Sequence, residues 1–110
     1  SALQGVFYFD FDQAIVRRDG HGELDEHAGV LANNPRLMVR LEGHADERGT
    51  REYNLALGER RANAVQSYLL SQGASRSQIE VVSYGEEKPA MNGHDQMSWE
   101  KNRRVEIVYR

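Results

Sequence analysis

Charged side chains are placed where they could form one site that binds both a cation and an anion. Asp12 follows an aromatic segment, Asp46 lies in a loop bounded by glycines, and Arg61 and Arg103 follow later in the chain. A carboxylate binds an ammonium group and a guanidinium binds a carboxylate, so this set suits a zwitterion such as a free amino-acid end. Two other interpretations stay open: Asp12 and Asp46 as an acid/base pair, or His44 and Asp46 as metal ligands.

The patterns expected of metal and nucleotide sites are missing from the sequence. The chain has no cysteine, and His21, His27 and His94 lack the i, i+4 spacing of a zinc-binding helix. Neither of the glycine-rich patterns that cradle phosphates occurs. We therefore predict no metal ion and no cofactor, and we expect a binding protein rather than an enzyme.

A long helix is predicted from Thr50 to Gln72, and it would position Arg61. Its apolar residues recur on one face and Gly73 is placed to end it, with Arg61 in the middle of the stripe formed by Tyr53, Leu57, Val65 and Leu69. A guanidinium on a sheet-facing stripe cannot stay buried without compensation. It could form a structural ion pair, extend to water, or bind a ligand.

Asn54 lies on the same helix face as Arg61, seven residues earlier, which is roughly 10 Å along the axis. Helical side chains lean toward the N-terminus of the helix, so both residues should point at the loop that contains Asp46. Loops between a strand and the following helix are favoured ligand sites, because the N–H groups of the helix attract anions.

The other elements are predicted from apolar alternation and from turn residues. The expected strands and helices are strand Val6–Phe11, helix 20–33, strand Leu37–Glu42, helix Thr50–Gln72, strand Ile79–Tyr84 and strand Val105–Tyr109. The order β-α-β-α-β-β predicts an α/β (α+β) two-layer sandwich, with a four-stranded mixed sheet and two main helices on one face.

This topology brings the candidate site residues to one edge of the sheet. The first two strands are joined by a helical crossover and should run in the same direction, so Asp12 and Asp46 should emerge together. The irregular loop before the last strand permits that strand to be antiparallel. Arg103 would then lie at the same edge, beside the two carboxylates.

Length and composition limit the class of protein. The 110 residues are typical of one domain, so we expect residues 1–110 to fold as a single unit. A net charge of −3 gives no general attraction to nucleic acid or to an anionic membrane, and we predict neither as a direct partner. No apolar run approaches the roughly 20 residues that span a bilayer.

Three separated motifs carry a family resemblance over about Phe7 to Tyr109. The string Gly43–Leu55, continuing as Gly58–Ala62, resembles the OmpA-like peptidoglycan-binding domain, as do Phe9–Asp12 upstream and Asn102–Val105 downstream. Within that family the chain looks most similar to the lipoprotein branch of Gram-negative bacteria. The motifs occur in the family's order, which is more specific than any one of them alone.

The resemblance implies noncovalent binding of the diaminopimelate side chain in peptidoglycan stem peptides. By motif position, Asp46 would bind the ligand ammonium and Arg61 its carboxylate. Asn54, Asp12 and Arg103 would add polar contacts, Leu57 and Phe11 would shape the wall, and Thr50 is a weaker candidate.

The same branch implies a place in the cell and a partner. Its members are attached to the periplasmic face of the outer membrane by a lipidated N-terminal cysteine, and they bind TolB of the Tol-Pal system. The chain has no cysteine, so the anchor is implied and not seen. The alternatives are a protein-docking module, the wall-anchoring domain of a porin or flagellar stator protein, and, less favoured, a peptidoglycan hydrolase with Asp12 or Asp46 as base.

Overall fold

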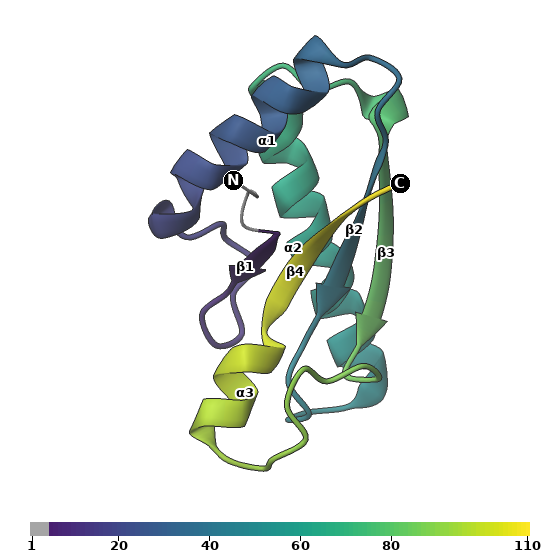
Figure 1. Cartoon of the computed structure of the whole chain (residues 1–110). Helices are drawn as coiled ribbons and strands as arrows, with labels where there is room; N and C mark the ends of the chain where they lie inside the picture. Colours follow the sequence, from purple (N-terminus) through teal and green to yellow (C-terminus); the bar gives the residue numbers. More distant parts are fainter. Residues whose placement is uncertain (1–4) are drawn as a thin grey trace.

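The computed structural model describes residues 5–110 and contains four strands and three helices (Figure 1). In chain order they are β1 Val6–Tyr8, α1 His21–Asn33, β2 Val39–His44, α2 Arg51–Ser71, β3 Ile79–Gly85, α3 Gln96–Asn102 and β4 Arg104–Tyr109. Short 3-10 turns at Arg18–Gly20 and Arg76–Gln78 precede α1 and β3. The predicted order of four strands and two main helices is confirmed, and α3 is an addition to it.

The strands form one mixed sheet in the order β1-β4-β2-β3. β4 is antiparallel to both of its neighbours, β1 and β2, whereas β2 and β3 are parallel. β1 and β2 therefore point the same way, as the crossover predicted. The loops that follow these two strands emerge at the same edge of the sheet, which is the edge that carries the candidate site.

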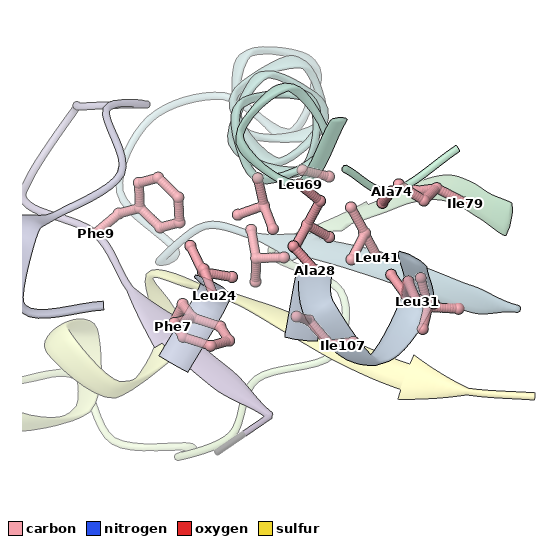
Figure 2. Close-up of a cluster of buried hydrophobic side chains, with 14 residues drawn as sticks. Phe7, Phe9, Leu24, Ala28, Leu31, Leu41, Leu69, Ala74, Ile79 and Ile107 are labelled. Carbon is pink, nitrogen blue, oxygen red and sulfur yellow. The ribbon is translucent and has the colours of Figure 1, made fainter. Parts of the chain in front are cut away.

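Both long helices pack on one face of the sheet, so the molecule has the two predicted layers (Figure 1). In Figure 2, Leu24 and Ala28 of α1 lie with Leu69 of α2 against side chains from the strands. Alternate residues of each strand point into this layer, which is the period expected of a half-covered sheet. The core consists of Phe7, Phe9, Leu24, Ala28, Leu31, Val39, Leu41, Ala62, Val65, Leu69, Ala74, Ile79, Val105 and Ile107.

Two glycines bring α2 into direct backbone contact with β2 beside the site. A Cβ added at Gly43 would lie 1.8 Å from the carbonyl oxygen of Gly58. A Cβ added at Gly58 would lie 2.4 Å from the Ser83 Oγ and 2.9 Å from the Gly43 carbonyl oxygen. No side chain fits between helix and strand here, so these glycines fix the height of α2 above the sheet.

Two predicted boundaries differ from the structure. β1 ends at Tyr8 instead of Phe11, because its partner β4 begins at Arg104. Beyond the Tyr8–Arg104 pair the Phe9 N–H still donates to the Arg103 carbonyl at 2.9 Å, but Arg103 is the C-cap residue of α3 and the strand pairing stops there. The segment before β4, expected to be an irregular loop, contains α3, whose first turn is capped by the Asp95 side chain on the Ser98 N–H. None of the helices within residues 5–110 is long and apolar enough to cross a membrane.

Candidate functional site

A pocket of about 260 Å³ opens between the loop after β1, the loop after β2 and the first turns of α2. Its lining combines charged, amide and apolar side chains. The lining residues are Phe11, Asp12, Asp46, Arg48, Gly49, Tyr53, Asn54, Leu57 and Arg61. The structure therefore brings six of the predicted site residues into one cavity, all except Arg103 and Thr50.

Arg61 lies at the base of this pocket and is fully buried. Its guanidinium donates to three backbone carbonyls: Nε to Gln13 at 2.8 Å, one terminal nitrogen to His44 at 2.9 Å and the other to Asp10 at 3.2 Å. It thus ties the loop after β1 to the end of β2. A guanidinium has five N–H donors, so these three bonds leave two for a ligand.

The charge of Arg61 is not cancelled by direct contact with a carboxylate within residues 5–110. Burial and the nearby charge of Arg103 lower the pKa of Arg61 to about 10, against the attraction of Asp46, Asp12 and Tyr53. The side chain remains protonated at neutral pH. A buried cation held mainly by carbonyl dipoles favours an anion in the cavity above it.

Asp46 is buried at the side of the pocket and is held by two arginines. Its Oδ1 accepts from the Arg48 backbone N–H at 2.9 Å and from Arg48 Nε at 3.1 Å, and its Oδ2 accepts from an Arg48 terminal nitrogen at 2.9 Å. A terminal nitrogen of Arg103 lies 3.5 Å from Oδ2. Burial alone would raise the pKa of Asp46, but the hydrogen bonds and charges of these arginines hold it below the usual value.

Arg48 forms one wall of the site, and its side chain is stacked between two aromatic rings. Its guanidinium carbon lies 4.2 Å from the ring centroid of Phe11 and 4.2 Å from that of Trp99. The Trp99 indole N–H donates to Glu47 at 2.9 Å, and Glu47 also contacts His94. α3 thus supports the pocket from outside, because its Trp99 ring stacks on one face of the Arg48 guanidinium.

The opposite wall is made by polar contacts from α2. The Tyr53 hydroxyl donates to Asp12, whose backbone has a φ of 58°, in the left-handed region that aspartate tolerates better than most residues. Asn54 is buried and its amide donates to Glu86 at 2.8 Å, which leaves the amide oxygen for other contacts. Tyr53, expected in the core stripe, is 43% exposed and belongs to the site.

The remaining candidates occupy supporting positions. Thr50 caps α2 by accepting the Tyr53 N–H at 3.0 Å, outside the pocket lining. Arg103 donates to the Phe9 carbonyl at 2.9 Å and lines a neighbouring cavity, so it reaches Asp46 from behind. Leu57 is buried in the pocket wall, and Phe11 is 58% exposed at its rim.

His44 does not join Asp46 in a metal site. Its ring lies beside Tyr84, with centroids 5.6 Å apart, and neither ring nitrogen has a hydrogen-bond partner within the described chain. Burial and the charges of Arg104 and Lys88, only partly offset by Glu106, lower the pKa of His44 to about 4. Residues 5–110 contain no group of three or more histidine, aspartate or glutamate side chains that could hold a metal ion.

Besides Tyr53, sequence reasoning missed three parts of the site, which are Arg48, Gly49 and Trp99. Arg48 lies only two residues from Asp46, where a side chain can return to the same carboxylate, and that short spacing was an available signal. Gly49 has a φ of 98°, in the left-handed region that glycine enters freely. The contact of Trp99 depends on how α3 packs, for which the sequence carries no periodic signal.

The fold and the pocket together define a small α+β domain with a cavity lined by charged side chains. The OmpA family model matches residues 8–103, which is most of the chain. The chain belongs to the OmpA family.

Two sequence relatives share a name. The Peptidoglycan-associated lipoprotein of Pseudomonas aeruginosa is 55% identical over 109 residues, which cover 97% of this chain and 64% of that protein. The protein of the same name from Haemophilus influenzae is 48% identical over 102 residues, covering 93% of this chain and 67% of its own length. The chain thus spans about two thirds of the length of these relatives.

Solved structures agree on the fold. The crystal structure of the peptidoglycan-associated lipoprotein from Burkholderia pseudomallei superposes with a TM-score of 0.96 at 45% identity, covering 97% of this chain and 91% of that one. The C-terminal domain of Helicobacter pylori MotB gives a TM-score of 0.87 at 22% identity, with 97% and 84% covered. The second likeness concerns the fold alone.

Proposed function

We propose that the chain binds peptidoglycan noncovalently through the diaminopimelate of its stem peptides, and that it is not an enzyme. The observation that carries this proposal is the pairing of a buried cation, Arg61, with a buried anion, Asp46, in one cavity. A free amino-acid end supplies the complementary pair, an ammonium and a carboxylate on one carbon. The relatives named peptidoglycan-associated lipoproteins support the choice of the cell wall as its source.

The ligand carboxylate lies over Arg61 in this proposal and uses its two remaining N–H donors. The ligand ammonium binds Asp46 and takes the place that the Arg48 guanidinium occupies on Oδ2. Arg48 therefore keeps the carboxylate paired while the site is empty, which limits the desolvation cost of a buried anion. Asn54, Asp12 and Arg103 add polar contacts, while Leu57 and Phe11 border the carbon chain of the ligand.

In the whole protein, this domain tethers the outer membrane to the cell wall. We propose that a lipid anchor holds it at the periplasmic face of the outer membrane, as the name of the lipoprotein relatives suggests. TolB of the Tol-Pal system is the proposed protein partner, on a surface that overlaps the pocket. Phe11 offers an exposed apolar contact beside the pocket for such a partner.

Cosedimentation with purified cell-wall sacculi tests the proposal. We expect the domain to pellet with walls built on diaminopimelate and to stay in the supernatant with walls built on lysine, which lacks the second carboxylate. Equal recovery with both walls would contradict diaminopimelate recognition. Release of soluble fragments from the walls would contradict the assignment as a non-enzymatic protein.

A further inference from the structure

The loop between β3 and α3 contains an Asn92–Gly93 pair that no part of the proposed function uses. Both residues are exposed and lie outside helix and strand. Within residues 5–110, neither the Asn92 carboxamide nor the Gly93 backbone N–H has a hydrogen-bond partner. We propose that Asn92 is a site of spontaneous deamidation, which converts it into aspartate and isoaspartate in the folded protein.

The reaction needs only the backbone and water. The Gly93 nitrogen attacks Cγ of Asn92, a C–N bond forms, and the Cγ–Nδ2 bond breaks as ammonia leaves with the proton from the Gly93 amide. The product is a five-membered succinimide. Water then opens the ring at either carbonyl, which gives aspartate when the side-chain amide bond breaks and isoaspartate when the original peptide bond breaks.

Glycine at position 93 favours the attack and is difficult to replace here. Glycine has no Cβ, so no side-chain atom hinders the approach of its nitrogen to Cγ of Asn92. A Cβ at this position would lie 2.3 Å from the Ser98 Oγ and 3.3 Å from the Ser98 Cβ. Ser98 is buried in the first turn of α3, so packing against that helix favours glycine at position 93. Glycine is also the residue after Asn92 that hinders the attack least.

The other five asparagines are protected, each in a way that the structure makes explicit. Asn33 and Asn34 donate their amides to the carbonyls of α1, and Asn34 precedes Pro35, which has no N–H to attack with. Asn102 is buried and its amide is paired with Met91. Asn54 and Asn63 lie inside α2, where the following N–H is held in the helix.

Deamidation would alter a loop that contacts Asn54 of the pocket. Hydrogen bonds fasten the loop on both sides of Asn92. Before it, Glu86 accepts from the Asn54 amide at 2.8 Å, and after it, His94 contacts Glu47 at 2.7 Å. Isoaspartate inserts an extra methylene into the backbone between these two contacts, and either product adds a carboxylate. The formal net charge changes from −3 to −4, since a neutral amide becomes an anion.

The test is to age the purified, folded protein at physiological temperature in mildly alkaline buffer and to map its peptides by mass spectrometry in water enriched in heavy oxygen. We expect a gain of one negative charge, heavy oxygen incorporated at position 92, and isoaspartate that an isoaspartyl methyltransferase labels. Asn92→Gln, which keeps the amide but disfavours the ring, should remove the acidic species. The five other asparagines are internal controls.

Two results would overturn the proposal. The first is that Asn92 stays intact in the folded protein while the same protein in denaturant converts fully, which would show that the folded loop forbids ring closure. The second is that another asparagine converts before Asn92. Neither readout involves peptidoglycan, so the outcome is independent of the proposed function.

Discussion

At the scale of single residues, Arg61 serves both the fold and the proposed ligand. Its three carbonyl partners come from the loop after β1, which carries Asp12, and from the end of β2, two residues before Asp46. Arg61 thus has a structural role, but in neither of the expected forms, an ion pair or a side chain that reaches water, since its partners are backbone carbonyls and it is fully buried. These contacts use only part of the donor capacity of the guanidinium. The same contacts that fix the loops also leave two N–H groups for a ligand.

Arg61→Ala should lower the free energy of unfolding by about 2 kcal/mol or more, because it removes the guanidinium donor from the carbonyls of Gln13 and His44, at roughly 1–3 kcal/mol for each buried unpaired group, whereas the Asp10 carbonyl keeps the Gln13 N–H. Urea unfolding followed by circular dichroism measures this. Arg76→Ala, which removes an exposed arginine without a described partner, is the matched control and should change little. An unchanged midpoint for Arg61→Ala would contradict the structural role.

Asp46→Asn should weaken binding of a diaminopimelate-containing muropeptide by about 1.5–3 kcal/mol, since a charge-assisted hydrogen bond is lost. Fluorescence anisotropy with a labelled muropeptide gives the ratio of affinities. Asp25→Asn, on the α1 surface where Asp25 contacts Tyr68, is the control for removing one carboxylate. Equal affinities for the two variants would exclude Asp46 as the ammonium ligand.

The predicted site residues that the structure brings into one pocket were found through regular elements, either on a helix or just after a strand. Helical spacing places Asn54, Leu57 and Arg61 on one face of α2, and the parallel direction of β1 and β2 brings Asp12 near Asp46. Arg48 was missed because loop geometry follows local hydrogen bonds instead of a period. Thr50 is the opposite case. It was a weaker candidate for ligand binding because of its position in the motif, and the structure explains that position by the capping of α2.

At the scale of elements, the pocket depends on how closely α2 approaches β2. Gly58→Ala introduces a methyl group 2.9 Å from the Gly43 carbonyl oxygen, so α2 must move away. We expect a loss of about 1–3 kcal/mol of stability, typical of overpacking, despite the better helix propensity of alanine. Thermal unfolding tests this, and muropeptide affinity should fall with it because α2 carries Asn54 and Arg61.

Gly29→Ala supplies the matched control for that prediction. Gly29 lies inside α1 and an added Cβ would meet no atom within 4 Å. The substitution should raise stability by roughly 0.5–1 kcal/mol through helix propensity alone. If Gly58→Ala were also stabilising, the close contact between helix and strand would not determine the position of α2.

The elements found from the sequence are those with long periodic patterns. α2 and the pairing partners β2, β3 and β4 were predicted within a few residues, because their apolar positions repeat. α3 was missed since its seven residues give barely two turns, and its cap Asp95 is the main local signal. β1 was predicted too long because strand length depends on the partner strand, which the local sequence does not contain.

At the scale of the whole molecule, stability should depend on pH through His44. Its pKa is about 4 in the folded state and 6.5 when unperturbed, so above pH 6.5 the imidazole is neutral in both states. Between pH 6.5 and 4 the unfolded chain binds the proton and the folded one does not. The free energy of unfolding should therefore fall with pH over this range, by at most about 3 kcal/mol.

Urea unfolding at several pH values measures this loss, and His44→Phe is the informative variant. The ring nitrogens of His44 have no described partners, so phenylalanine keeps the packing and removes the titration. The variant should lose less stability than the parent between pH 6.5 and 4. The same slope in both proteins would show that other groups, such as Asp46 with its lowered pKa, account for the acid dependence.

The central claim is that Asp46 and Arg61 form one clamp for a zwitterion, and calorimetric titration tests it most directly. The domain is titrated with a muropeptide that contains diaminopimelate and, in parallel, with the lysine analogue that lacks the second carboxylate. We predict saturable, one-to-one binding of the first and no detectable heat from the second. Equal binding of both would contradict the carboxylate contact of Arg61, and binding of neither would contradict peptidoglycan recognition by this pocket.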